Sequence, residues 1–296
     1  MNSLSENLEI DKEEAIRGWL RVLILVIPYI FVVVFFQFFG ALLVGIDYTE
    51  EVYKEHSYQD FVILVFGNAG TFLILWIFMK YVDKESFVKL GFQVKGRWND
   101  FVLGFLVGMV IMMMGFLILI LSKDIAFEKI HMDEQEMAIL FALFILVSVG
   151  EEVLIRGYVL KNFMLSFNKY FALIVSSLLF SIMHGFNPHF DFIAFVNLFL
   201  AGLVLGISYI YSKNLWFPIG MHLSWNFFQS ILGFNVSGMD KYSLLVISMD
   251  EPNRINGGLF GLEGSYFVTF ASIISIFLLA NFFSKKEKQQ IGMSYR

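Results

Sequence analysis

Two adjacent carboxylates and an arginine lie inside an apolar stretch of the chain. Glu151, Glu152 and Arg156 follow directly on an apolar run from Ile139 to Val149. A charged side chain at hydrocarbon depth is unfavourable by about 3 kcal/mol on insertion scales. If this segment spans a bilayer, these three residues are therefore the first candidates for a functional site.

Two later apolar segments contain further polar side chains. His184 follows Phe180 by one helical turn in the first of them. His222 and Asn226 lie four positions apart in the second, a spacing that places both on the same face of a helix. We expect Glu151, Glu152, Arg156, His184, His222 and Asn226 to form one site.

These residue types suit the hydrolysis of an amide bond without a covalent intermediate. A buried glutamate can act as a general base towards water, and a histidine across a cavity can share the proton. His222 and Asn226 are hydrogen-bond donors suited to a developing oxyanion. Other protease chemistries fit less well, because the chain has no cysteine, no Gly-x-Ser-x-Gly motif and no pair of intramembrane aspartates.

The same side chains could also bind a metal ion. Glutamate and histidine are ordinary zinc ligands, but the helical His-Glu-x-x-His signature of metalloproteases is absent. The sequence therefore predicts no cofactor with certainty and leaves a divalent metal such as zinc open.

The composition predicts a polytopic membrane protein. Of 296 residues, 58% are hydrophobic and 16% are charged, against about 25% charged in a soluble domain, and the mean hydropathy is +0.71. Several apolar runs reach the roughly 20 residues that cross a bilayer. We predict an all-α fold with eight spans: 19–46, 61–82, 101–121, 137–163, 170–186, 192–211, 215–234 and 266–283.

The distribution of lysine and arginine predicts the topology. Basic residues cluster before the first span, after the second, after the fourth and after the last, so both termini are expected in the cytoplasm. We expect a polar cytoplasmic N-terminus (1–18), one membrane domain (19–283) and a basic cytoplasmic tail (284–296).

Depth along the predicted helices is compatible with one site. At a rise of about 1.5 Å per residue, Glu151 lies roughly 18 Å from either end of its span. The same calculation places Asn226 near the middle of the bilayer, His184 nearer its outer face and His222 nearer its cytoplasmic face. Helix tilt can therefore bring these residues into one cavity.

Each residue also has a structural interpretation. Glu152 and Arg156 are four apart and can neutralise each other within the helix. Glu151 points about 100° away, so Arg156 neutralises it less easily and a functional role is favoured. A single histidine could bond one helix to another, but two histidines and an asparagine at matching depth weaken that alternative.

The three polar groups form motifs that resemble those of the CAAX prenyl protease type II and bacteriocin-processing (CPBP, or Abi) family. The motifs read Glu-Glu-x-x-x-Arg at 151–156, Phe-x-x-x-His at 180–184 and His-x-x-x-Asn at 222–226. A Gly-Gly-x-Phe-Gly-x-Glu-Gly-Ser stretch at 257–265 also resembles the family's loop before its last helix. The resemblance covers about 139–283.

The resemblance implies an eight-helix intramembrane endopeptidase. Glu151 would activate water with help from His184, His222 and Asn226 would form the oxyanion hole, and Glu152 with Arg156 would help to hold the cavity. The implied substrate is a hydrophobic or prenylated peptide or protein in the lipid bilayer, with no nucleic-acid partner. We expect an integral protein of a bacterial plasma membrane.

Two other functions use the same residues. A non-proteolytic scaffold or bacteriocin self-immunity protein could bind a partner in the cavity, as some members of the family act without proteolysis. A proton-coupled carrier could use buried Glu and His as a relay, but the chain has no repeated broken helices in corresponding halves.

Overall fold

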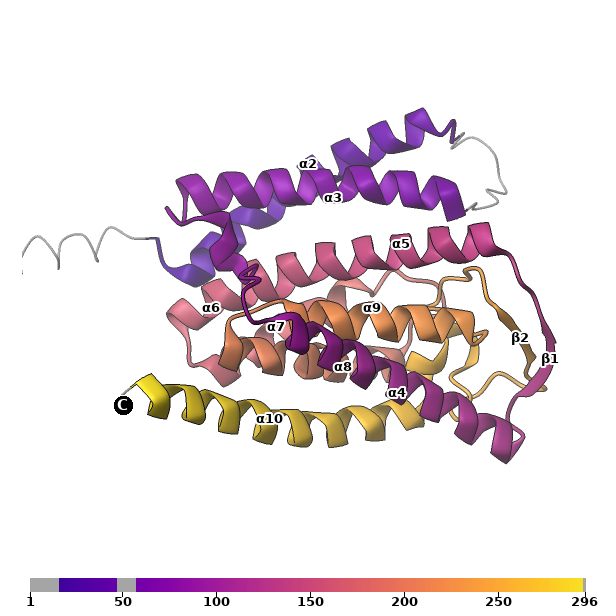
Figure 1. The fold of residues 1–296 in the computed structure, drawn as a ribbon. Coiled ribbons are helices and arrows are strands. Elements are labelled where there is room, and N and C mark those ends of the chain that lie inside the picture. Colours follow the sequence, from indigo (N-terminus) through magenta and orange to yellow (C-terminus); the bar gives the residue numbers. More distant parts are fainter. Residues whose placement is uncertain (1–15, 47–56, 295–296) are drawn as a thin grey trace, which may run out of the picture.

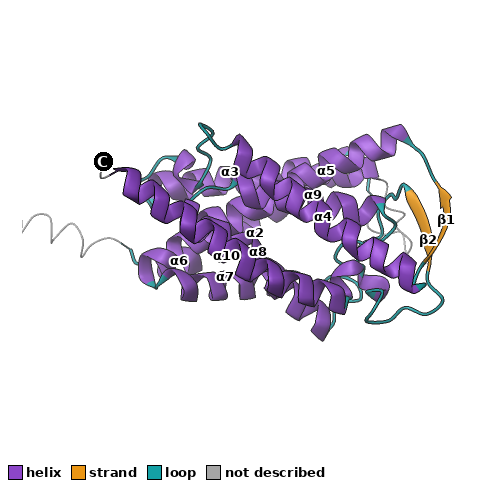
Figure 2. Cartoon of the chain, turned by 60° about the horizontal axis from the view of Figure 1, so that its bottom comes forward, coloured by secondary structure: helices purple, strands orange, loops and turns teal. Residues whose placement is uncertain are grey.

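The computed structural model describes residues 16–46 and 57–294. Most of the predicted polar N-terminus therefore lies outside the described residues. Long apolar helices arranged side by side make up most of the described chain (Figures 1 and 2). Within these described residues, six helices are long and apolar enough to cross a membrane: Gly18–Leu43 (α2), Ser57–Tyr81 (α3), Trp98–Ser122 (α4), Glu134–Ser166, Phe192–Ser212 (α8) and Tyr266–Ser294 (α10).

Two shorter helices complete the bundle, α7 (Lys169–Met183) and α9 (Trp216–Ile231). With them the described chain has a helix at each of the eight predicted spans, which confirms the all-α, polytopic fold. The helix α7 ends at Met183, before the predicted Phe186, with His184 as its C-cap residue. The helix α9 ends before the predicted Phe234, at a turn where Gly233 has a φ of 99° that favours glycine.

The last helix is longer than predicted. The helix α10 continues past Phe283 to Ser294, because 284–291 contains lysine, glutamate and glutamine, which are good helix formers, and no glycine or proline. Most of the predicted tail 284–296 is thus a helical extension.

Polar side chains cap three of the helices that carry the site. Asp133 accepts hydrogen bonds from backbone N–H groups at the start of α5 (Glu134–Glu152), Asn168 does so at α7 and Asp191 at α8. Such caps satisfy N–H groups that the first helical turn leaves without partners. The caps fix the residue at which each helix begins, and hence the depth at which its site residues lie in the bundle.

The fourth helix changes its winding at the site. After α5 it continues as a π-helix, η2 (Val153–Leu160), and then as α6 (Lys161–Ser166). Every residue of η2 is buried. The π-helical turns begin directly after Glu152, at the start of the segment that carries Arg156.

A small sheet lies at one end of the bundle. The strands β1 (Ala126–Ile130) and β2 (Leu245–Ser248) pair antiparallel, with Ala126 opposite Ser248 and an irregularity between Phe127 and Lys129. Both strands lie in segments between the predicted spans. Short 3₁₀ turns occur at Phe87–Leu90 (η1), Gly258–Phe260 (η3) and Leu262–Gly264 (η4).

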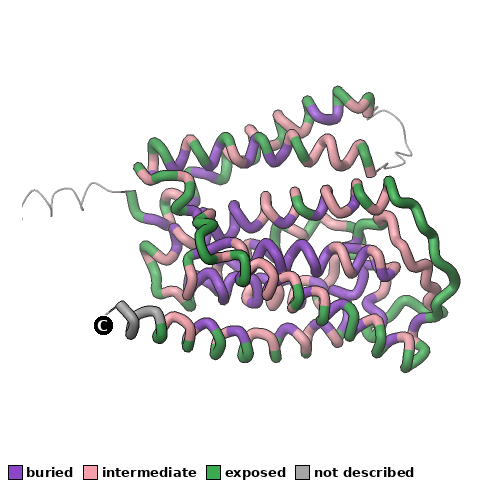
Figure 3. Tube along the Cα trace, viewed as in Figure 1, coloured by how far each residue is buried: buried purple, intermediate pink, exposed green. Residues whose placement is uncertain are grey.

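Burial identifies the centre of the bundle. Of the most apolar part of α8, 61% is buried, against 11% for α2, and Figure 3 shows the same contrast. A Cβ atom at Gly202 of α8 would lie 2.8 Å from the Ser177 Cβ of α7. Glycine therefore lets α7 and α8 approach closely, in the spacing with Gly206 that favours helix contact in membranes.

Candidate active site

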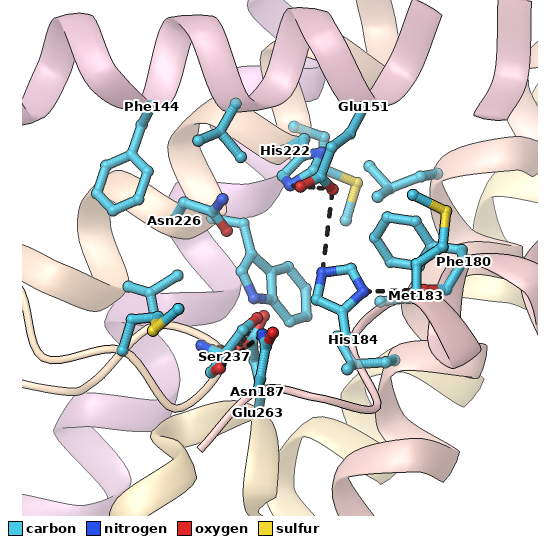
Figure 4. A pocket seen from close by; sticks show the side chains of 18 of the residues that line it. Phe144, Glu151, Phe180, Met183, His184, Asn187, His222, Asn226, Ser237 and Glu263 are labelled. Atoms are coloured by element: carbon cyan, nitrogen blue, oxygen red, sulfur yellow. Dashed lines mark hydrogen bonds and ion pairs between the residues drawn. The ribbon is translucent and has the colours of Figure 1, made fainter. Parts of the chain in front are cut away.

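A cavity of about 310 Å³ lies between α5, α7, α8, α9 and the loop before α10 (Figure 4). Pockets of this volume and larger commonly take small ligands or short segments. Four of the predicted site residues line the cavity, and the other two lie behind its wall. The lining four are Glu151, His184, His222 and Asn226.

Glu152, Arg156 and His222 form a buried network. One oxygen of Glu152, Oε1, accepts hydrogen bonds from Arg156 Nη1 at 2.7 Å and from His222 Nδ1 at 2.9 Å. Arg156 Nη2 also donates to the Gly202 carbonyl at 3.2 Å, and its guanidinium lies 4.5 Å from the centre of the Phe180 ring. Charge-assisted bonds of this length are strong, so the network fixes the His222 ring on α9 relative to α5.

Both histidines direct Nε2 towards Glu151. The carbonyl of Phe180 accepts a hydrogen bond from His184 Nδ1 at 2.8 Å, which places the proton of a neutral ring on Nδ1 and leaves Nε2 as an acceptor. Glu151 Oε2 lies 4.0 Å from His184 Nε2 and 3.9 Å from His222 Nε2 (Figure 4). These separations exceed a direct hydrogen bond and suit bridging by water.

Glu151 differs from Glu152 in its surroundings. The Glu152 side chain is 0% exposed, whereas that of Glu151 is 32% exposed. Among the residues that the structure describes, none donates a hydrogen bond to Glu151 Oε2, although this atom is buried. A buried carboxylate oxygen ordinarily has a partner, so Oε2 is available to a group that enters the cavity.

The side-chain amide of Asn226 is also available to a group that enters the cavity. It lies one turn after His222 on α9, is 6% exposed and points into the cavity in Figure 4. No described residue is hydrogen-bonded to its side-chain amide. Its N–H₂ group can therefore donate to a ligand.

Glu263 was missed as a site residue. It lines the cavity, and its Oε2 accepts hydrogen bonds from the Ser237 backbone N–H at 2.7 Å, from Ser237 Oγ at 2.8 Å and from Gln229 Nε2 at 3.3 Å. Asn187 also lines the cavity and donates to the Ser237 carbonyl at 2.9 Å. The only sequence signal for Glu263 was its place in the Gly-rich stretch 257–265.

The described residues do not assemble a metal site. Within 16–46 and 57–294, no cluster of three His, Asp or Glu side chains could hold a metal ion. The Nδ1 atoms of His184 and His222 are hydrogen-bonded to Phe180 and Glu152. Metal-ligating histidines are commonly held in this way, with the other ring nitrogen hydrogen-bonded, so the divalent metal that the sequence left open stays a prediction.

Comparison with known families agrees with the motifs. Residues 133–228 match the family model described as type II CAAX prenyl endopeptidase Rce1-like. The matched segment begins at the cap of α5, ends within α9 and contains all three motifs. Comparisons with curated proteins and with solved structures find no match. Over residues 133–228, the chain is thus similar to the Rce1-like type II CAAX prenyl endopeptidases.

Proposed function

We propose that the chain is an intramembrane endopeptidase in which Glu151 and His184 activate a water molecule. The family supports a membrane protease of the CAAX type in general. The observation that carries the finer assignment is that His184 Nε2 and His222 Nε2 both lie about 4 Å from one buried oxygen of Glu151. A water bound to Glu151 Oε2 would be within reach of His184 as well.

The reaction uses protein groups and water. Glu151, assisted by His184, takes a proton as the water oxygen bonds to the carbonyl carbon of the scissile peptide. The carbonyl oxygen becomes an oxyanion, to which Asn226 Nδ2 donates, as does Nε2–H of His222 in its cationic form. The C–N bond then breaks, the leaving nitrogen receives the proton, and the products are a carboxylate and an amine.

Glu152 and Arg156 have a positioning role in this proposal. Neither lines the cavity, and both are buried. Glu152 orients His222 through Nδ1, and Arg156 balances the charge of Glu152. The same division of labour holds at other sites where a carboxylate orients a histidine.

The walls of the cavity favour an apolar substrate. Its lining includes Leu143, Phe144, Val147, Met183 and Leu198, with few polar groups besides the site itself. Hydrophobic lining of this kind suits a hydrophobic or prenylated peptide segment. We propose such a peptide, within the bilayer of a bacterial plasma membrane, as the substrate, and no nucleic acid as a partner.

Cleavage by the purified chain tests the proposal. A panel of quenched fluorescent hydrophobic and prenylated peptides would be incubated in detergent with the native chain and with Glu151→Gln, each with and without a zinc chelator. We expect cleavage by the native chain in both conditions and none by the variant. Cleavage by folded Glu151→Gln would contradict the proposal, and loss of native cleavage under chelator would indicate a metalloenzyme.

The alternative is a scaffold or bacteriocin-immunity role in the same cavity. In that case the native chain would cleave no peptide, and Glu151→Gln would retain the biological phenotype, because the substitution keeps the shape of the side chain. Loss of the phenotype on this change would count against the scaffold.

A further inference from the structure

The two ends of the helix bundle differ in their basic residues. At the end that carries the start of α2 and the end of α10, at the left of Figure 1, lysines and arginines occur in every described connection. We call this the basic end; its members are Arg17, Arg21, Lys80, Lys84, Lys89, Lys95, Arg97, Lys161, Lys169, Lys213, Lys285, Lys286 and Lys288.

The opposite end, which carries β1 and β2 and is called the strand end, has far fewer basic residues. Its described members are Lys123, Lys129, Lys241 and Arg254. Acidic side chains outnumber them there, among them Asp133, Glu134, Glu136, Asp191, Asp240, Asp250 and Glu251. Cytoplasmic loops carry the excess of lysine and arginine in membrane proteins. The basic end is therefore cytoplasmic and the strand end extracytoplasmic.

Two short helices leave space on one side of the bilayer only. The helices α7 and α9 both begin at the basic end and have 15 and 16 residues, which gives lengths of about 22 and 24 Å. A hydrocarbon core is about 30 Å thick. Both helices thus end before they reach the strand end, and irregular backbone follows them.

The cavity occupies that space. Non-helical backbone at membrane depth is tolerated where it is buried or lines a water-filled cavity, and loop residues Asn187, Ser237 and Met239 line this one. On its other side lies η2, whose residues are all buried and which continues the fourth helix towards the basic end. The cavity is therefore closed towards the basic end.

The exposed lining residues mark the mouth. Met183, at the end of α7, is 49% exposed and Met239, in the loop after α9, is 36% exposed. Lys241 also lines the cavity and forms an ion pair of 2.5 Å with Asp60 of α3. Met239 and Lys241 lie in the loop that follows α9, which runs from the basic end towards the strand end. Met183 lies at about the depth of Glu151, since the next residue, His184, faces Glu151.

We infer that the cavity opens to the extracytoplasmic side of the membrane. Given the proposed peptidase function, the substrate is then an apolar peptide that has already crossed or entered the bilayer, rather than a protein that approaches from the cytoplasm. A lipidated cytosolic C-terminus would meet the closed side of the site.

Single cysteines can test this orientation, because the native chain has none. Met239→Cys reports on the mouth, Met183→Cys is a second reporter there, and Lys95→Cys is the matched control at the basic end. Intact cells that express each variant would be treated with a membrane-impermeant maleimide, before and after permeabilisation. The cysteine-free chain gives the background.

We expect the mouth cysteines to react in intact cells and Lys95→Cys to react only after permeabilisation. The reverse pattern would overturn the inference. So would mouth cysteines that fail to react even in detergent, since the cavity would then have no open mouth.

Activity measured from each side separates this inference from the proposed function. A cleavable peptide would be added outside right-side-out vesicles and outside inverted vesicles, with detergent-solubilised protein as reference. We expect cleavage in right-side-out vesicles. Cleavage in detergent and in inverted vesicles alone would overturn the orientation but leave the peptidase intact. Absence of cleavage in detergent would overturn the peptidase, and the labelling would still decide the orientation.

Discussion

Glu151 and Glu152 are neighbours in the sequence, yet only Glu152 is bound to Arg156. The Arg156 guanidinium lies 2.7 Å from Glu152 Oε1, whereas Glu151 faces the cavity and the two histidines. In the proposed mechanism the two carboxylates therefore have different tasks: Glu152 holds the site together and Glu151 meets the substrate. This difference leads to opposite expectations for two matched substitutions.

Glu152→Gln should destabilise the protein. The change removes the negative charge but leaves Arg156 buried, and breaking a buried ion pair on one side costs about 3–5 kcal/mol. The free energy of unfolding or the melting temperature in detergent would measure the loss.

Glu151→Gln is the matched control for that measurement. Because no described residue bonds to Glu151 Oε2 directly, its stability should stay close to that of the native chain. A Glu152→Gln variant as stable as this control would show that the ion pair does not support the fold.

Asn226→Ala should reduce turnover without unfolding the protein. Removing one donor from an oxyanion site lowers kcat by about 10²–10³-fold, while the apolar contacts that bind the peptide remain and KM changes little. Kinetics of the purified variant beside its melting temperature would distinguish this from a structural defect. A large rise in KM with kcat preserved would place Asn226 in substrate binding instead.

Asp191 links stability to pH at the strand end. Partial burial acts to raise its pKa, but hydrogen bonds from the Ala194 backbone and the ion pair with Arg254 hold the pKa of Asp191 below its ordinary value. A lowered folded pKa means that the stabilisation is present above the unfolded pKa of about 3.9 and is lost as pH falls through the folded value.

The matched variants are Asp191→Asn and Asp191→Ala. Asparagine keeps the helix cap but not the charge, so it should cost only a few tenths of a kcal/mol at pH 7. This deficit should begin to shrink as pH falls below about 4 and vanish below the folded pKa. Alanine also loses the cap, worth about 1 kcal/mol, at every pH. Melting temperatures across pH 3 to pH 8 would check both; a pH-independent deficit for asparagine would contradict the account.

The sequence was sufficient for the features that depend on local pattern. Apolar runs of bilayer length predicted each helix, and the four-residue spacing predicted the Glu152–Arg156 pair. The motifs predicted the family. The roles of Glu151, His184, His222 and Asn226 in catalysis stay predictions, although the structure brings all four to one cavity.

Features that depend on distant partners could not be predicted. Glu263 bonds to Ser237 and Gln229, and nothing in the local sequence indicates which residues a loop carboxylate will meet. The strand β1 needs β2, which lies more than a hundred positions later and shares no pattern with it. The π-helical winding of η2 likewise has no signal in its own residues, since its buried, apolar sequence is also suited to an ordinary α-helix.

The central claim is that Glu151 and His184 act together on one water, and a double-mutant cycle tests it most directly. Cleavage rates would be compared for the native chain, Glu151→Gln, His184→Ala and the double variant, after each is shown to be folded in detergent. Residues that act as a unit are strongly non-additive, so we predict that each single change lowers the rate about as much as the double change. Single effects that multiply in the double variant, or cleavage that survives either change, would contradict the account.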